Sequence, residues 1–282
     1  MNFLSSQADF LPRFFALLTI LHVELYQTAS QSVIEPGMRT RNKIIIVVFA
    51  ILVVASAGFV IWAETPLGPM SEALDALKSD SRVSVSTGDW LVFQPTNSTT
   101  HTGFIFYPGG RVDYRSYAPE AHAIAADGYL VVIVRMPLNL AVLDPNAAQK
   151  VVDSYPSITS WAVGGHSLGG TMAAQYASNA PKSVRGLMLW TSYPASGNDL
   201  SKTGLMVATI HGTMDGLVSS GQIDDSLKML PAGTVRVEIQ GGNHAQFGWY
   251  GPQPGDNDAT VSREEQQSIT VKVTTELLSG IS

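Results

Sequence analysis

The sequence predicts an α/β protein with a mainly parallel, eight-stranded sheet flanked by helices, preceded by one N-terminal transmembrane helix. Three observations support this prediction. Residues 44–63 form a long apolar run, and from residue 81 onward eight short runs rich in β-branched and aromatic residues alternate with longer segments. Alternation of this kind is typical of a parallel sheet with helices on both faces. A length of 282 residues suffices for one such domain and an additional segment.

The composition excludes several classes of protein. Hydrophobic residues make up 45% of the chain and charged residues only 14%, well below the usual quarter, which indicates a membrane segment or a very large core. The net charge of -6 argues against a nucleic-acid partner, because a polyanion repels an acidic protein. Because the chain has no cysteine, it has no disulfide framework, no thiolate metal site and no cysteine nucleophile.

The apolar run at residues 44–63 (IIIVVFAILVVASAGFVIWA) is predicted to be a transmembrane signal-anchor that contacts the lipid bilayer. At about 1.5 Å per residue, roughly 20 residues span about 30 Å of hydrocarbon. Arg39, Arg41 and Lys43 precede the run, so the positive-inside rule places the N-terminus in the cytoplasm and everything after Glu64 outside. The predicted parts are an N-terminal extension with a basic flank (1–43), the anchor (44–63), a linker helix (64–80) and an α/β domain (81–282).

A cleavable signal peptide is the alternative for the same run. The basic stretch MRTRNK, followed by apolar residues and by Ala55-Ser56-Ala57, fits cleavage after Ala57. The apolar run continues beyond that point, which favours an uncleaved anchor. Residues 1–37 are assigned no function, and whether translation starts at Met1 or Met38 stays open.

The eight predicted strands all lie in the domain at 81–282, and the linker before it reads as a short helix capped by Ser71. The first two strands are expected to form an antiparallel edge, because the segments that could form helices begin after the third. The runs are 82–86, 90–95, 103–108, 129–136, 158–165, 185–190, 205–210 and 234–239.

A serine between glycines follows the fifth run. GHSLG at residues 165–169 lies between a predicted strand and an alanine-rich helix, which is the strand-turn-helix context of a nucleophile elbow. In such an elbow Ser167 points outward above the helix N-terminus. The structural alternative is a glycine-rich bend with a capping serine, since this five-residue pattern also arises by chance.

A base and an acid for Ser167 follow two later strands. His244, in the glycine-flanked loop QGGNHAQFG after the eighth run, is the best candidate base among the six histidines. Asp215, in HGTMDGLVS after the seventh run, is the candidate acid, which gives the chain order Ser, Asp, His. Asp224 and Asp225 are interpreted as solvated surface residues of a helix.

Two turns offer donors for an oxyanion. One is the backbone N–H of Leu168, directly after the candidate nucleophile. The other comes from Gly109 or Gly110 in FYPGGRVDYRSY, after the third run. An ordinary Pro-Gly turn is the structural alternative for this second segment.

These motifs together resemble the alpha/beta hydrolase fold-5 family, whose members are often membrane-anchored carboxylesterases. The resemblance rests on FIFYPGGRVDYRSYAP, GYLVVIVRMPLNLAV, GGHSLGG, HGTMDGLV and GNHAQFGWYGPQPGDNDATVSREEQ. It implies an eight-stranded alpha/beta-hydrolase sheet, a catalytic triad at Ser167, Asp215 and His244, and an oxyanion turn at Gly109 and Gly110. In many lipases a His-Gly pair precedes these glycines, whereas this chain has Tyr107 and Pro108.

The substrate pocket is expected to be open. In the resembled fold a cap is commonly inserted after the sixth strand, and residues 190–204 are too few for a helical cap. The candidate lining residues named next can instead belong to the core. The candidate lining residues are Tyr193, Leu138, Leu140 and Val142, together with the aromatic group Phe247, Trp249 and Tyr250.

The sequence therefore predicts a serine hydrolase that cleaves a small ester through an acyl-enzyme intermediate. A peptidase or amidase on the same triad is the enzymatic alternative, and a non-catalytic binding module on a hydrolase scaffold is the third. The sequence has no cluster of metal ligands, no Walker loop and no dinucleotide fingerprint, so neither a metal nor a cofactor is expected. The natural substrate and the oligomeric state do not follow from the sequence.

Overall fold

The computed structural model describes residues 40–96 and 99–282, and the chain forms two compact units that divide between Phe59 and Val60. The predicted extension lies outside the described residues, apart from 40–43. Helix α3 (Thr40–Ala63) contains Ile44–Ala63, the one helical segment of the described chain that is long and apolar enough to cross a membrane. A signal sequence would satisfy the same criteria of length and composition. The last turn of α3 belongs to the second unit.

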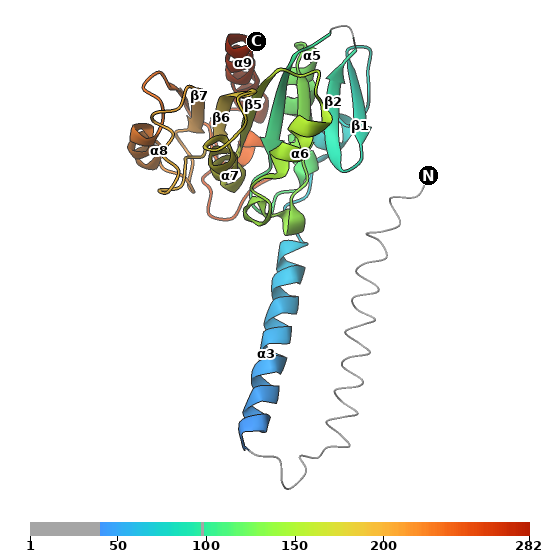
Figure 1. The fold of residues 1–282 in the computed structure, drawn as a ribbon, viewed down its shortest axis with the longest axis vertical. Coiled ribbons are helices and arrows are strands. Elements are labelled where there is room, and N and C mark those ends of the chain that lie inside the picture. The colour runs from blue at the N-terminus through green and yellow to red at the C-terminus, as the bar shows by residue number, and fades with distance from the viewer. Residues whose placement is uncertain (1–39, 97–98) are drawn as a thin grey trace. The chain divides into compact units, whose positions relative to one another are not determined.

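The second unit is built on one eight-stranded sheet, which confirms the predicted fold class (Figure 1). The strand order is β1-β2-β4-β3-β5-β6-β7-β8. The pairs β1–β2 and β2–β4 are antiparallel, and all the others are parallel, so the first two strands form the expected antiparallel edge. The strands are β1 (Val83–Thr87), β2 (Trp90–Pro95), β3 (Thr102–Tyr107), β4 (Leu130–Val134), β5 (Ser160–His166), β6 (Val184–Trp190), β7 (Met206–Gly212) and β8 (Val235–Ile239).

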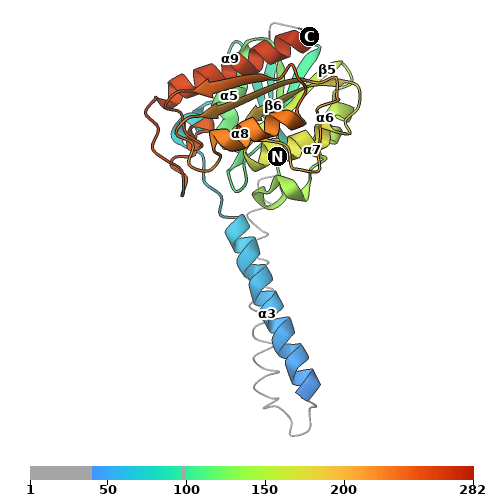
Figure 2. The same ribbon diagram turned by 90° about the vertical axis from the view of Figure 1, so that its left-hand side faces the viewer.

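Helices cover both faces of the sheet (Figure 2). The side chains of α5 and α9 pack into one buried cluster with Phe104 and Phe106, whereas those of α6 and α7 pack into a second cluster with Ile105 and Val163. Neighbouring residues of a strand point to opposite faces, which is why the fully apolar central strands supply both clusters. The helices of this unit are α4 (Ser71–Asp75), α5 (Ala118–Ala126), α6 (Ala147–Ser154), α7 (Leu168–Ala177), α8 (Ser220–Ser226) and α9 (Arg263–Ile281).

The parallel register brings the predicted site loops to one edge. Tyr107 at the end of β3 pairs with Gly165, His166 at the end of β5 pairs with Trp190, and Gly212 at the end of β7 pairs with Ile239. The segments after β3, β5, β6, β7 and β8 therefore leave the sheet at the same carboxyl edge, where open α/β sheets bind ligands.

Two connections bear on the predictions. The linker does contain a short helix, but its N-cap residue is Met70, and Ser71 is the first helical residue. The Ser71 hydroxyl bonds to the carboxylate of Glu72 and caps no backbone N–H. Residues 191–205, between β6 and β7, contain turns and bends but no helix. No helical cap is therefore inserted at this point of the described chain.

Candidate active site

Ser167 lies in a sharp turn between β5 and α7. Its backbone has φ 53° and ψ -124°, a conformation that L-residues rarely adopt and that persists only where the surroundings impose it. A Cβ atom on Gly165 would lie 2.5 Å from the carbonyl oxygen of Tyr107, and one on Gly169 would lie 2.2 Å from the same oxygen. Only glycine fits at these two positions, so the turn has the geometry of a nucleophile elbow.

Asp215 and His244 form a buried pair in the loops after β7 and β8. Asp215 Oδ2 lies 2.9 Å from His244 Nδ1, and both side chains are fully inaccessible to solvent. The other carboxylate oxygen, Oδ1, accepts from the backbone N–H of Leu217 at 2.8 Å and of Val218 at 2.7 Å. Burial alone would raise the pKa of Asp215, but the interactions with His244, together with the hydrogen bonds from Thr191 and Val218, hold the pKa below its usual value.

This pairing leaves one nitrogen of His244 available. Because an ionised carboxylate only accepts, Nδ1 of His244 carries the proton that faces Asp215. The other nitrogen, Nε2, is buried and has no hydrogen-bond partner within residues 40–96 and 99–282, and no hydrogen bond links it to Ser167 there. A neutral His244 in this tautomer presents an acceptor at Nε2, as a general base must.

Two residues that the sequence did not single out contact the candidate acid and its loop and the loop of the candidate base. Thr191, just after β6, donates from its hydroxyl to Asp215 Oδ2 and has a positive φ of 41°. Asp256 accepts from Gly216 N through Oδ1 at 2.9 Å and from Ala245 N through Oδ2 at 2.8 Å. Asp256 therefore ties the loop of the acid to the loop of the base.

The candidate oxyanion turn follows β3, as predicted, but its two glycines differ. The N–H of Gly109 donates to the hydroxyl of Tyr117 at 3.0 Å and is already satisfied. The N–H groups of Gly110 and Leu168 have no acceptor in the described parts of the chain. A Cβ atom on Gly110 would lie 3.1 Å from Leu168 Cδ2, so the two residues are neighbours. The pair of free donors is therefore Gly110 and Leu168.

Tyr117 also contacts the elbow through His166. The Tyr117 hydroxyl lies 2.8 Å from His166 Nδ1 and accepts from Gly109 N, so it joins the candidate oxyanion turn to the histidine of the elbow. The ring of His166 lies 4.5 Å from the ring of His244, between centroids. Burial, and then the charge of His244, lower the pKa of His166 well below its usual value, so His166 is neutral.

The predicted pocket residues separate into two groups. Leu138, Leu140 and Tyr193 are partly exposed, and Leu140 Cδ2 approaches within 3.9 Å of the position of a Cβ on Gly110. By contrast, Phe247 is fully buried and its ring stacks 6.0 Å from that of His166. Trp249 is 9% exposed and donates from Nε1 to Gln267 on α9. Phe247 and Trp249 thus pack in the interior because their loop folds back against α9.

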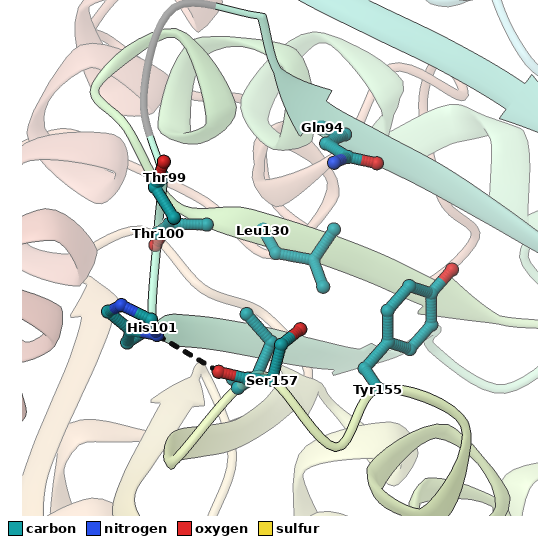
Figure 3. A pocket seen from close by; sticks show the side chains of 8 residues that line it. Gln94, Thr99, Thr100, His101, Leu130, Tyr155 and Ser157 are labelled. Carbon is teal, nitrogen blue, oxygen red and sulfur yellow. Dashed lines mark hydrogen bonds between the residues drawn. The ribbon is translucent and has the colours of Figure 1, made fainter.

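A cavity of about 240 Å³ lies at the opposite edge of the sheet (Figure 3). Its lining includes Leu130, the first residue of β4, and His101, which precedes β3 and contacts the carbonyl oxygen of Ser157 at 3.1 Å. These positions belong to the amino ends of the parallel strands. The cavity therefore lies at the other end of the strands from Ser167, which follows the carboxyl end of β5, and none of the predicted site residues lines it. Within the described ranges, no group of three or more His, Cys, Asp or Glu side chains could hold a metal ion.

Comparison with known proteins gives one family and a set of similar folds. The sequence model of the Alpha/beta hydrolase family matches residues 103–268. No curated protein matches the sequence significantly. The esterase domain of a Rhodothermus marinus protein superposes with a TM-score of 0.53 at 11% identity, covering 69% of this chain and 96% of that one. A thermophilic esterase of Thermogutta terrifontis superposes with a TM-score of 0.54 at 13% identity, covering 72% and 93%. A structure of the same esterase with butyrate bound gives 0.55 at 12% identity, covering 72% and 95%.

Proposed function

Since the chain belongs to the alpha/beta hydrolase family, we propose that it is a serine hydrolase that cleaves a small carboxylic ester. Ser167 is the nucleophile, His244 the general base and Asp215 the acid that orients it. The observation that carries the proposal is the buried Asp215–His244 pair, which fixes the proton on Nδ1 and leaves Nε2 without a partner among the residues described. The strained elbow at Ser167 supports it independently.

The proposed reaction has two steps. Ser167 Oγ attacks the ester carbonyl carbon while its proton passes to His244 Nε2. The negative charge that develops on the carbonyl oxygen is stabilised by the N–H groups of Leu168 and Gly110, which replace water without reorganising. His244 then gives the proton to the leaving alkoxide, and the acyl group remains on Ser167. A water molecule, activated in the same way, releases the acid and restores Ser167.

The test is covalent labelling with a fluorophosphonate together with turnover of matched substrates. Ser167→Ala is expected to lose both labelling and ester hydrolysis, whereas Ser178→Ala, at the end of the same helix, keeps both. Full labelling of Ser167→Ala contradicts the proposal. Faster turnover of an anilide than of the ester with the same acyl group identifies an amidase or peptidase. A wild-type chain that neither labels nor turns over either substrate identifies a binding module.

The acyl pocket is proposed to be shallow. Leu140 lies beside Gly110, Leu138 and Tyr193 are partly exposed, and residues 191–205 provide no helical cover. A shallow site of this kind holds short acyl groups, because each buried methylene contributes only about 0.8 kcal/mol.

For residues 44–63 we propose a membrane anchor with the hydrolase domain outside the cytoplasm. The length and composition of the helix and the three basic residues before it support this orientation. Protease added to intact cells should then degrade the domain, and detergent should be needed to extract the protein. Recovery of a soluble form that begins near Gly58 would show cleavage after Ala57 instead.

A further inference from the structure

The last two residues of the apolar run and the four that follow it are hydrogen-bonded to the segment of the proposed oxyanion turn. We call residues 62–67 the junction segment; it lies wholly in the second compact unit. At the end of α3 the last backbone carbonyls have no partner within the helix and need donors from elsewhere. Arg111 donates from Nε to Trp62 O at 2.8 Å and from Nη2 to Thr65 O at 2.7 Å, and Asn139 donates from Nδ2 to Ala63 O at 3.0 Å. A guanidinium at a helix C-terminus is also favoured by the helix dipole.

Backbone hydrogen bonds tie the same residues together. Leu67 N donates to Arg111 O at 2.8 Å, and Asp113 N donates to Leu67 O at 2.9 Å, so Leu67 and Val112 form a short parallel bridge. Arg111 N donates to Asn139 O at 2.8 Å. Arg111 follows Gly110 directly, so its backbone bonds to Leu67 and Asn139 act beside the free donor of the proposed oxyanion turn.

Strained backbone conformations are found at the residues that contact the junction segment. Among the described residues, five that are not glycine have a positive φ. Ser167 and Thr191 are the proposed nucleophile and the partner of the acid. The other three are Arg111 at 55°, Leu138 at 51° and Asn139 at 55°. Such conformations persist only where the surrounding structure imposes them and concentrate at functional sites. For Arg111 and Asn139, the imposed contacts are those with the junction segment.

We infer that the junction segment positions the oxyanion turn, and that Arg111 is a positioning residue for catalysis. This inference rests on the proposed esterase function. The guanidinium holds the junction segment on one side, and the backbone of the same residue fixes the direction of Gly110 on the other. Cleavage after Ala57 would leave residues 62–67 attached to the domain, so the device works in the anchored and in the processed form alike.

The experiment uses the full chain in detergent and an aryl ester. Arg111→Met keeps the aliphatic stem and the Cβ but removes the donors, and we expect kcat to fall about 10- to 100-fold with KM nearly unchanged. This loss is smaller than the roughly 10²–10³-fold cost of deleting an oxyanion donor outright, because the donor is displaced and not removed. Arg111→Lys, which keeps the charge without the planar fork, should recover part of the loss. Arg115→Ala is the matched control, since its guanidinium pairs with Asp113 instead.

A thionoester separates positioning from general damage. Its sulfur is a poorer hydrogen-bond acceptor than oxygen, so it profits less from the oxyanion donors, and Arg111→Met should lower the rate ratio between ester and thionoester. Asn139→Gly, which removes the bond to Ala63 while glycine accepts the same backbone conformation, should act in the same direction if Arg111→Met does not fold. Unchanged kcat in both variants, or equal losses on the two substrates with a lower Tm, overturns the inference. An inactive wild-type chain overturns the proposed function itself and the inference with it.

Discussion

The substitution Asp215→Asn tests the acid of the proposed triad most directly. Each carboxylate oxygen of Asp215 accepts two hydrogen bonds. Oδ1 accepts from the backbone N–H groups of Leu217 and Val218, and Oδ2 accepts from His244 and from the hydroxyl of Thr191. An asparagine has the same shape but offers only one acceptor oxygen and one NH₂ group. Whichever way it is placed, its NH₂ group meets two donors.

The structure decides which way the asparagine turns. The backbone donors of Leu217 and Val218 cannot rearrange, so the amide oxygen remains with them and the NH₂ group faces His244. The hydroxyl of Thr191 can rotate away, but the imidazole must accept at Nδ1 and move its proton to Nε2. In that tautomer Nε2 has no lone pair for the proton of Ser167. By analogy with a wrong-tautomer triad, kcat should fall by about 10⁴, or roughly 5 kcal/mol at about 1.4 kcal/mol per factor of ten.

The assay is steady-state hydrolysis of a short aryl ester, with fluorophosphonate labelling as a second measure of serine reactivity. Both rates should fall while KM changes little, because the acid does not contact substrate. Thermal unfolding checks that the variant is folded, since the mispaired buried amide costs about 1–3 kcal/mol. Asp225→Asn is the control, because that side chain is 86% exposed. A loss of kcat below about tenfold would refute the reasoning and move the acid to another residue.

Three further predictions follow. Asp256→Asn loses one of the two bonds between the acid and base loops and should lower kcat about 10- to 100-fold at similar KM, whereas the exposed neighbour in Asp258→Asn should not matter; a change below twofold would contradict the bridging role. The free energy of unfolding should fall as the pH drops below about 6.5, by up to about 1.4 kcal/mol per pH unit, because His166 becomes protonated in the unfolded chain but stays neutral in the folded one. Calorimetry between pH 7.5 and 5 should show a shallower slope for His166→Asn, and equal slopes would disprove this cause. Across aryl esters, kcat/KM should peak at short acyl chains without interfacial activation, and Leu140→Trp should narrow the profile; a steady rise to long chains would exclude a shallow pocket.

The strands and the site loops differ in how far the sequence determines them. All eight strands appear where the β-branched runs predicted them, because a central parallel strand is buried on both faces and must be apolar throughout. The strand order, in which β4 lies outside β3, has no signature in any single run. The contact of Asp215 with His244 could be anticipated because strand ends of a parallel sheet meet at one edge, whereas their catalytic roles stay a prediction.

The residues that contact the candidate acid and base loops from other parts of the chain were not identified from the sequence. Thr191 and Asp256 are ordinary loop residues in the sequence. Thr191 contacts Asp215, 24 residues away, and Asp256 contacts Gly216 and Ala245, 40 and 11 residues away. Phe247 and Trp249 show the converse: an aromatic residue beside a candidate base can face either the site or the core, and here α9 determines that it faces the core. A loop has no periodicity that would reveal which side its residues face.

The proposed oxyanion turn and the proposed base are in contact with the same pair of buried side chains, Tyr117 and His166. The Tyr117 hydroxyl joins Gly109 N to His166 Nδ1, and His166 lies against the ring of His244. A substitution at Tyr117 therefore disturbs both halves of the proposed machinery, and its effect should not add to that of one at His166, because both remove the same hydrogen bond. By the inference above, Arg111 acts on the same turn through the junction segment, and within residues 40–96 and 99–282 its side chain has no partner in common with that of Tyr117. The fold losses of kcat from Tyr117→Phe and Arg111→Met should accordingly multiply in the double variant. Those from Tyr117→Phe and His166→Asn should not, because one hydrogen bond is lost in either case. The two double variants therefore measure which side chains hold the turn in place.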